Sequence, residues 1–230
     1  MNTVINILGQ LESVIRKSKN KLLRKKDPHF SAVERWYTED ARGLKRFEFD
    51  FLTPQSVVID LGGYLGEWTS GLFSRYQPRI YIFEPVKEYA GVIAKRFAHN
   101  SSIKVEQAGL APASAVTRIT LDEFESKVVG AKHPVLNTEE IRLIGIKDYF
   151  EKEGLQKVDL VKINIEGAEY DLLEYLFESG LIGKIDNFLI QFHTWERDAQ
   201  SRRNALRKKF SADFEEVYNY PFVWECWKRK

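Results

Sequence analysis

The chain has 230 residues, of which 43% are hydrophobic and 13% aromatic, and its formal net charge is +2. This length and apolar content fit one large domain or two small domains with a packed core. The single cysteine, Cys226, excludes an internal disulfide and a cysteine-rich metal site, which fits a reducing compartment. The sequence has no apolar run of about 18 residues and no apolar leader, so we expect a soluble protein of the cytoplasm.

Positive charge gathers in residues 1–26, which hold seven lysines and arginines against one acidic residue. Apolar residues recur there at helical spacing, which predicts a basic amphipathic helix or helix pair. Two uses of this segment stay open. It makes a peripheral contact with an anionic membrane surface or acidic partner, or it caps the domain with a solvated charged face. We favour the cap, because an apolar stripe needs only a core to cover it.

From Ser56 onward, apolar runs of strand character alternate with helical patterns. The expected strands are 57–61, 80–83, 103–107, 158–163 and 187–192, and the expected helices are 67–75, 87–98, 147–153, 168–179 and 199–209. This alternation predicts βαβ units and a mostly parallel sheet with helices on both faces. Residues 214–218 and 222–227 alternate in period two around a turn at 219–221, which predicts a C-terminal antiparallel hairpin.

Two segments carry no diagnostic pattern. Residues 27–53 hold many aromatic and charged side chains without a Gly or Ser linker, so we expect them to pack on the main domain. Within residues 111–143, we expect an extra strand at 116–121 and a loop at 130–137 that borders a bound ligand.

The first expected strand ends in a carboxylate and a glycine-rich turn. Asp60 lies at the strand tip, and Gly62, Gly63 and Gly66 follow. Glycine lets the backbone approach a ligand, and the next helix offers unpaired N–H groups, so we expect a nucleotide-like ligand. The spacing departs from the dinucleotide fingerprint G-x-G-x-x-G, and Asp60 would repel a pyrophosphate. A cofactor with an ammonium and a sulfonium fits better. This indicates S-adenosylmethionine rather than NAD, and a turn without any ligand is the alternative.

An acid closes the next strand. Glu84 lies 22 residues after Gly62, near the interval at which a strand-tip acid binds the hydroxyls of a ribose. Pro85 favours an extended Glu84, which keeps the carboxylate at the strand end. A solvated strand cap is the alternative. The third strand ends around Ala108, where we expect contact with the adenine.

Polar side chains recur on one face of the strand expected at 158–163 and of its continuation. Period-two geometry places Lys162, Asn164 and Glu166 on the same face. Because lysine is seldom buried without a partner, we expect an acid to neutralise Lys162, in a structural pair or in the site. Asn164 and Glu166 lie nearer the carboxyl end of the strand, where open α/β sheets bind ligands. We therefore predict that Asn164 contacts the cofactor and that Glu166 takes part in catalysis.

One strand later, His193 emerges beside this polar face. A neutral imidazole near pH 7 can take a proton from a hydroxyl, so His193 is the candidate general base and Glu166 its partner or a substrate ligand. A structural histidine is the alternative. No H-E-x-x-H, paired-cysteine or EF-hand spacing occurs, so we predict no dedicated metal site, although a loosely held divalent ion at Glu166 and His193 stays open.

Four stretches together resemble the FkbM-type methyltransferases: V-V-I-D-L-G-G-Y-L-G-E-W, I-F-E-P, D-L-V-K-I-N-I-E-G-A-E and L-I-Q-F-H, which fall within residues 55–195. The resemblance implies a Rossmann-like class I methyltransferase fold, S-adenosylmethionine as the cofactor, and O-methylation of a sugar or polyketide-like hydroxyl. Asn164 stands where the family usually has Asp, and Gly62-Gly63-Tyr64 replaces the commoner G-A-N turn. On this basis residues 54–230 form the cofactor-binding methyltransferase domain, and residues 1–53 a helical segment packed on it.

We therefore expect an S-adenosylmethionine-dependent O-methyltransferase that acts on a hydroxyl of a sugar, glycan or other small molecule. Two alternatives stay open. A nucleotide-dependent oxidoreductase would share the sheet, and a non-catalytic nucleic-acid-binding module would use the basic segment and the cluster from Arg202 to Lys209. Nucleic acid ranks last, because aromatic residues do not interleave with these charges. No pattern in the sequence identifies the acceptor molecule or the oligomeric state.

Overall fold

The computed structural model of the chain describes residues 28–122, 125–128, 138–194 and 197–230. The helices are α2 (Pro28–Glu39), α3 (Glu67–Tyr76), α4 (Lys87–Arg96), α5 (Ile146–Lys152), α6 (Glu169–Glu178), the 3-10 helix η1 (Leu181–Lys184) and α7 (Ala199–Asp213). The strands are β1 (Val57–Leu61), β2 (Arg79–Phe83), β3 (Ile103–Glu106), β4 (Gly109–Ala111), β5 (Ala115–Asp122), β6 (Glu125–Val128), β7 (Thr138–Gly145), β8 (Leu160–Ile163), β9 (Asn187–Ile190), β10 (Phe214–Tyr220) and β11 (Trp224–Arg229). The basic helix expected over 1–26 and the loop expected at 130–137 lie outside the described residues.

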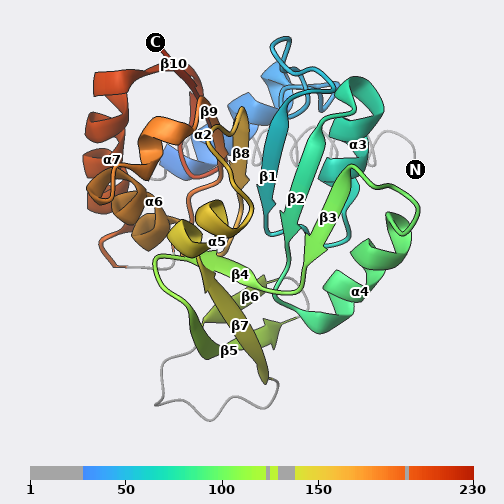
Figure 1. The fold of residues 1–230 in the computed structure, drawn as a ribbon. Helices are drawn as coiled ribbons and strands as arrows, with labels where there is room; N and C mark the ends of the chain where they lie inside the picture. The colour runs from blue at the N-terminus through green and yellow to red at the C-terminus, as the bar shows by residue number, and fades with distance from the viewer. Residues whose placement is uncertain (1–27, 123–124, 129–137, 195–196) are drawn as a thin grey trace, which may run out of the picture.

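A seven-stranded sheet crosses the molecule in the order β10-β11-β9-β8-β1-β2-β3. Strands β1, β2, β3, β8 and β9 are parallel, whereas β11 runs antiparallel to both β9 and β10. Helices α2, α3 and α4 pack on one face of the sheet, and α5, α6 and α7 pack on the other (Figure 1). This arrangement confirms the expected α/β class, a mostly parallel Rossmann-like sheet that ends in an antiparallel hairpin.

Alternate residues of the central strands supply two separate apolar cores. On β1, Ile59 faces the core shared with α5, α6 and α7, while Val58 faces the core shared with α2, α3 and α4. All five residues of β1 are buried. A strand covered on both faces is apolar almost throughout, which is why residues 57–61, apolar except for Asp60, predict β1 with the correct ends.

The five expected strands and five expected helices of the main sheet are all present, with shifted ends. Helix α7 ends four residues later than expected, at Asp213, and in the hairpin β10 continues to Tyr220, so the turn falls at Pro221 and Phe222. The N–H of Val223 donates to the carbonyl of Tyr220 at 2.8 Å, and Phe222 has a φ of 59°. Proline suits the second position of such a turn, so the turn predicted at 219–221 is displaced toward the C-terminus.

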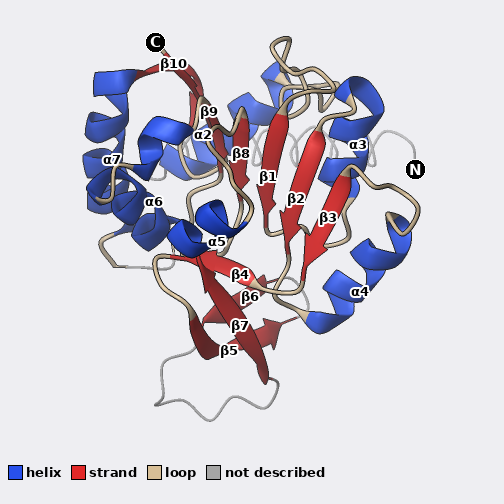
Figure 2. Cartoon of the chain, viewed as in Figure 1, coloured by secondary structure: helices blue, strands red, loops and turns tan. Residues whose placement is uncertain are grey.

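A second sheet, in the order β4-β7-β5-β6, lies next to the carboxyl ends of β1, β2 and β3 (Figure 2). The strand expected at 116–121 is β5, but β4, β6 and β7 have no counterpart among the expected elements. Ile119 and Ile141 of this sheet pack on Val86, just after β2. The N–H of Lys87 also donates to Glu139 Oε1 at 2.8 Å. The second sheet is thereby fixed to the start of α4, at the edge of the main sheet where a ligand is expected.

The residues before β1 pack on the main sheet. Trp36 of α2, Phe49 and Leu52 are buried in the same core as Val58 and Ile80 of the central strands. This confirms the expected packing of this part of the chain, although the helix α2 itself is an addition to the expected elements. The division of the chain at residue 53 stays a prediction. Among the described residues, no helix is both long enough and apolar enough to cross a bilayer.

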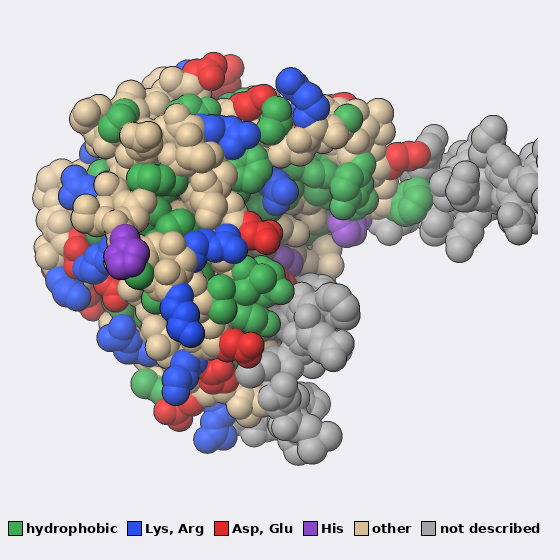
Figure 3. Space-filling view, turned by 90° about the vertical axis from the view of Figure 1, so that its right-hand side faces the viewer, with side chains coloured by type: hydrophobic (Ala, Val, Ile, Leu, Met, Phe, Trp, Pro, Cys, Tyr) green, Lys and Arg blue, Asp and Glu red, His purple; other side chains and the backbone are tan. Residues whose placement is uncertain are grey.

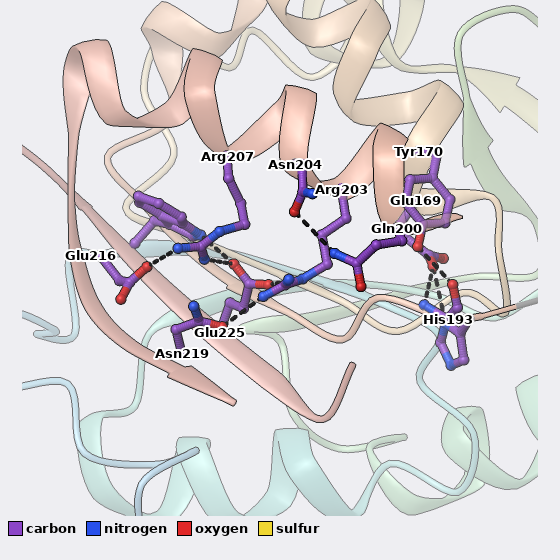
Figure 4. Close-up of polar contacts among 11 residues, drawn as sticks. Glu169, Tyr170, His193, Gln200, Arg203, Asn204, Arg207, Glu216, Asn219 and Glu225 are labelled. Carbon is purple, nitrogen blue, oxygen red and sulfur yellow. Dashed lines mark hydrogen bonds and ion pairs between the residues drawn. The ribbon is translucent and has the colours of Figure 1, made fainter. Parts of the chain in front are cut away.

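Buried ion pairs join α7 to the C-terminal hairpin. Arg203 Nε lies 2.5 Å from Glu225 Oε1, and Arg207 Nη1 lies 2.6 Å from Glu225 Oε2 (Figure 4). Arg203 also donates to Asn219 Oδ1 at 2.7 Å. The side chains of Arg203 and Glu225 are 4% and 1% exposed, so this pair is desolvated, and Arg207 covers the same carboxylate from a partly exposed position. Arg203 and Arg207 thus have structural partners in β10 and β11, whereas Arg202 pairs with Asp171 and Glu174 of α6. Strand β11 in turn pairs with β9 of the site.

Candidate active site

Four neighbouring parallel strands end at the same edge of the main sheet. Leu61 of β1 pairs with Phe83 of β2 and with Ile163 of β8. Ile163 in turn pairs with Ile190 of β9. These strands lie side by side in the order β2, β1, β8 and β9 (Figure 1). The segments that follow their ends carry the predicted site residues in the same order: Glu84, the glycine turn, Asn164 with Glu166, and His193. The topology therefore brings together positions that are up to 133 residues apart in the chain, from Asp60 to His193.

The glycines of the turn are required by the packing of the protein itself. Gly62 has a φ of 81°, and a Cβ atom there would lie 1.9 Å from the carbonyl oxygen of Asn164. A Cβ atom on Gly63 would lie 2.4 Å from Ile82 Cγ2. Gly66 has a φ of 77°, in the left-handed region that favours glycine. The turn is therefore pressed against β8 and β2 without any ligand.

Asp60 forms a buried ion pair rather than an open anionic strand tip. Its Oδ1 lies 2.9 Å from Lys162 Nζ, and its Oδ2 accepts a hydrogen bond from the hydroxyl of Thr69 at 2.7 Å. Asp60 is 0% exposed. Lys162 also donates to the carbonyl of Gly62 at 2.7 Å. The expected acid partner of Lys162 is confirmed. The predicted attraction of Asp60 for the cationic end of a cofactor is wrong, because Lys162 neutralises the carboxylate. The ion pair instead stabilises the glycine turn through the hydrogen bond from Lys162 to Gly62.

Glu84 is buried against the glycine turn. Its Oε2 accepts a hydrogen bond from the N–H of Tyr64 at 2.8 Å, and its Oε1 accepts one from the N–H of Val86 at 3.0 Å. Glu84 is 5% exposed, and burial raises its pKa to about 7 even though both N–H groups and Lys162 favour the carboxylate. The carboxyl group thus lies at the strand end expected for a ribose ligand and already positions the turn.

Two further predicted cofactor residues differ in accessibility. Ala108 is 0% exposed, so the structure does not bring it to an accessible surface, and the exposed residue beside it is Gln107. Asn164 is only partly buried, and its Oδ1 atom is buried with no hydrogen-bond partner among the described residues. A buried amide oxygen without a partner costs free energy. Asn164 is therefore the better of these two candidates for a ligand contact.

His193 lies between two carboxylates. Its Nε2 atom lies 3.3 Å from Glu166 Oε2. Its Nδ1 atom lies 3.1 Å from Glu169 Oε1 (Figure 4). The hydroxyl of Tyr170 donates to the carbonyl of His193 at 2.6 Å. The predicted neighbourhood of His193 and Glu166 is thus present. Glu169 is an addition to the predicted site; its signal in the sequence is the second acid of the E-G-A-E stretch, which also fits an ordinary acid in the first turn of a helix.

The charge of His193 differs from the prediction. Burial lowers the pKa of the ring, but the hydrogen bonds to Glu166 and Glu169 outweigh burial and raise the pKa to about 9. Both ring nitrogens face carboxylate oxygens, and only the imidazolium can donate at both. The expectation of a neutral imidazole at pH 7 is therefore wrong for this arrangement.

Backbone strain accompanies the same edge of the sheet. Tyr64 and Glu166, in the turns after β1 and β8, have φ angles of 49° and 53°. Residues other than glycine rarely adopt this left-handed backbone conformation, and those that do cluster at functional sites. Tyr64 is 53% exposed, and its ring lies 4.7 Å from the ring of Tyr89 in an edge-to-face contact. An aromatic pair formed by the exposed Tyr64 and the partly buried Tyr89 therefore borders Glu84, between the glycine turn and the second sheet.

A hollow of about 500 Å³ lies elsewhere, between β5, β7 and α5. Its lining includes Val116, Arg142, Tyr149 and Lys152 but none of the predicted site residues. The described residues hold no group of three or more His, Cys, Asp or Glu side chains placed to bind a metal ion. On the face shown in Figure 3, the Lys and Arg side chains are scattered among hydrophobic and neutral surface rather than gathered in one block.

Comparisons with known proteins agree with this geometry. Residues 60–220, which include the glycine turn, Glu84, Glu166 and His193, match the family model described as the methyltransferase FkbM domain. The chain is 25% identical over 178 residues to Methyltransferase 1 of Beauveria bassiana (strain ARSEF 2860), an alignment that covers 67% of this chain and 71% of that protein. The structure of a presumed rRNA methylase from Clostridium thermocellum is similar, with a TM-score of 0.50 and 11% identity over 84% of this chain and 94% of that one, which shows the fold alone. The chain belongs to the FkbM methyltransferase family and is an S-adenosylmethionine-dependent methyltransferase.

Proposed function

We propose that this enzyme transfers the methyl group to a hydroxyl of a sugar, glycan or other small molecule. The observation that carries this proposal is the Glu166–His193 pair at the carboxyl edge of the sheet, next to the glycine turn. The Glu166 side chain is 26% exposed, so a carboxylate is open to an incoming acceptor. A hydroxyl must lose its proton as it is methylated, whereas many nitrogen acceptors attack through a free lone pair. An available carboxylate base therefore favours oxygen as the acceptor atom.

The residues of this edge fit S-adenosylmethionine. Asn164 Oδ1 is a buried acceptor without a described partner, which suits the cofactor's ammonium group. Helix α3 begins after Gly66 with no side-chain cap, so its first N–H groups suit the cofactor's carboxylate. The Glu84 carboxyl group suits the hydroxyls of the ribose. The bound cofactor would supply an electrophilic methyl carbon, whose bond to sulfur breaks with its electron pair left on sulfur as the acceptor oxygen bonds to carbon.

The chain's own contribution is to orient the acceptor and receive its proton. The hydroxyl proton passes to Glu166 as the oxygen attacks, so that no alkoxide has to form in advance. The His193 imidazolium lies 3.3 Å from Glu166 Oε2 and keeps the carboxylate ionised and in place. The second sheet and the pair formed by Tyr64 and Tyr89 border the same edge and would hold the acceptor. Much of the rate acceleration then comes from alignment, without a covalent intermediate.

Cofactor affinity should rise with pH around neutrality. The free protein holds Glu84 with a pKa of about 7, and ribose hydroxyls donate to the ionised form. By proton linkage, the dissociation constant for S-adenosylmethionine should fall about tenfold between about pH 6 and pH 8, with proton release at the acidic end. Calorimetry in buffers of different ionisation enthalpy measures both quantities. Glu84→Gln should bind S-adenosylmethionine more weakly, and its affinity should no longer depend on pH. The exposed control Glu88→Gln should keep the wild-type affinity and the wild-type pH dependence. Equal wild-type affinity at both pH values would remove Glu84 from the cofactor site.

The proposed acceptor class is tested by following an isotope-labelled methyl group. The full chain is incubated with labelled S-adenosylmethionine and, separately, with hydroxylated small molecules, glycans and RNA. Mass spectrometry of the products then identifies the methylated atom. The proposal expects a methyl ether on a small molecule or glycan. Label on a nitrogen atom, or on RNA alone, would overturn it.

A further inference from the structure

Glu169 is the most enclosed member of the carboxylate–histidine cluster. Its side chain is 0% exposed, although α6 begins at this residue and a first-turn acid is ordinarily solvated. Oε2 accepts a hydrogen bond from the N–H of Gly167 at 2.8 Å. Oε1 accepts one from the N–H of His193 at 2.7 Å and lies 3.1 Å from His193 Nδ1. One carboxylate therefore joins the strained turn after β8 to both the backbone and the ring of His193.

We propose that Glu169 is a positioning residue, which holds the His193 ring and keeps a proton on it so that Glu166 receives the proton of the acceptor. This inference rests on the proposed function for the role of Glu166. It assigns to Glu169 no contact with substrate or cofactor.

The exposure of the three side chains sets their order of action. Glu169 is 0% exposed, the His193 side chain 8% and the Glu166 side chain 26%. Only the outermost carboxylate is open to an acceptor, and the ring lies between it and the buried carboxylate. A buried carboxylate without a cationic partner is costly, so Glu169 favours a charged ring. The charged ring in turn has no free lone pair with which to act as a base.

The described contacts of His193 come from the loop after β8 and from α6. Glu166 belongs to the loop after β8, and Glu169 and Tyr170 belong to α6. The hydroxyl of Tyr170 meets the carbonyl of His193 rather than the ring, so it fixes the backbone without changing the charge. The hydrogen bonds from both carboxylates raise the pKa of His193, which agrees with the geometry.

NMR titration of the His193 ring tests the inference independently of catalysis. In the wild-type chain, with the signal assigned by His193→Gln, the ring should titrate at about 9. Glu169→Gln keeps an oxygen acceptor but removes the charge, so the His193 pKa should fall by about one pH unit or more. The control Asp171→Asn, on the same helix at a side chain that is 70% exposed, should leave it unchanged. Glu169→Gln should also lower kcat while the affinity for S-adenosylmethionine stays within about twofold, because no cofactor contact is lost.

The outcomes separate this inference from the proposed function. An unchanged His193 pKa in Glu169→Gln overturns it, and so does an unchanged kcat when the pKa has fallen. If Glu169→Gln does not fold, Glu169→Asp provides the test. Aspartate keeps the charge, but its shorter side chain cannot reach His193 Nδ1. An unchanged His193 pKa in Glu169→Asp also overturns the inference. If the His193 pKa falls as expected but no hydroxyl is methylated by the wild-type chain, the proposed function fails while the coupling of Glu169 to His193 stands.

Discussion

Lys162→Met should lower the free energy of unfolding by about 3–5 kcal/mol, because it leaves the buried Asp60 carboxylate without its cation. Asp60 is 0% exposed, and its Oδ1 lies 2.9 Å from Lys162 Nζ. The remaining hydrogen bond from Thr69 cannot balance a full charge. Urea unfolding at pH 7 measures the loss. The variant should also bind S-adenosylmethionine more weakly, because the hydrogen bond from Lys162 to the carbonyl of Gly62 is lost at the same time.

A double variant separates the charge from the packing. Asp60→Asn combined with Lys162→Met removes both charges and keeps an acceptor for Thr69, so its stability should return to within about 1–2 kcal/mol of the wild type. The matched control is Lys157→Met, which breaks an exposed pair with Asp186 at 2.7 Å. It should cost less than about 1 kcal/mol. Similar losses for Lys157→Met and Lys162→Met would mean that the Asp60 charge is solvated and that the argument from burial is wrong.

S-adenosylmethionine is predicted correctly from the sequence, but one of the reasons is wrong. The prediction treats Asp60 as an unpaired carboxylate that repels a pyrophosphate, whereas Asp60 is paired with Lys162. Periodicity along β8 shows that Lys162 needs an acid, but not that the acid is Asp60, 102 residues earlier. With that pairing known, Asp60 can no longer repel a pyrophosphate. The glycines are similar, because the obstacle to a side chain at Gly62 is the carbonyl of Asn164, which lies just after the neighbouring strand β8. Local pattern identifies the turn, and only the tertiary contact explains it.

The elements missed in the sequence share a dependence on distant partners. Among the strands predicted correctly, the central strands β1, β8 and β9 are buried throughout and are mostly apolar. In contrast, β4 is three residues long and exists by pairing with β7, more than 30 residues later. Strand β7 is partly exposed and contains several charged residues, so its sequence does not read as a buried strand. The second sheet, which borders the site, is therefore the part of the fold that the sequence pattern could not specify.

The same limit applies to the catalytic cluster. The sequence correctly places Glu166 and His193 beyond the ends of neighbouring parallel strands, which share their carboxyl edge. The period-two pattern itself does not extend to Glu166, because β8 ends at Ile163 and Glu166 lies in the turn after it. The proton on His193 depends on Glu169, whose position in a helix start suggests a solvated acid. Since a second carboxylate reverses the protonation state, the role of His193 could not be predicted without the fold. In the proposed function the base is therefore Glu166 rather than the imidazole.

Glu166→Gln should reduce kcat by about 10²- to 10⁴-fold, because the amide cannot take the acceptor's proton. By transition-state arithmetic this corresponds to about 3–5 kcal/mol of activation free energy. The substitution keeps the size of the side chain and an oxygen that can accept from His193, so the fold and the cofactor affinity should change little. Single-turnover assays with the best acceptor measure the rate of methyl transfer, and calorimetry with S-adenosylmethionine measures the cofactor affinity separately.

The control for this prediction is Glu178→Gln at the exposed end of α6, which makes the same change in charge and should retain full kcat. His193→Gln offers a second comparison. If His193 is the positive neighbour of the base rather than the base, its loss should reduce kcat less than the loss of Glu166. A larger loss in His193→Gln would restore the imidazole as the base. An equal loss of kcat and cofactor affinity in Glu166→Gln would instead make Glu166 a binding residue, since a group that acts only on the transferred proton leaves the ground-state complex intact.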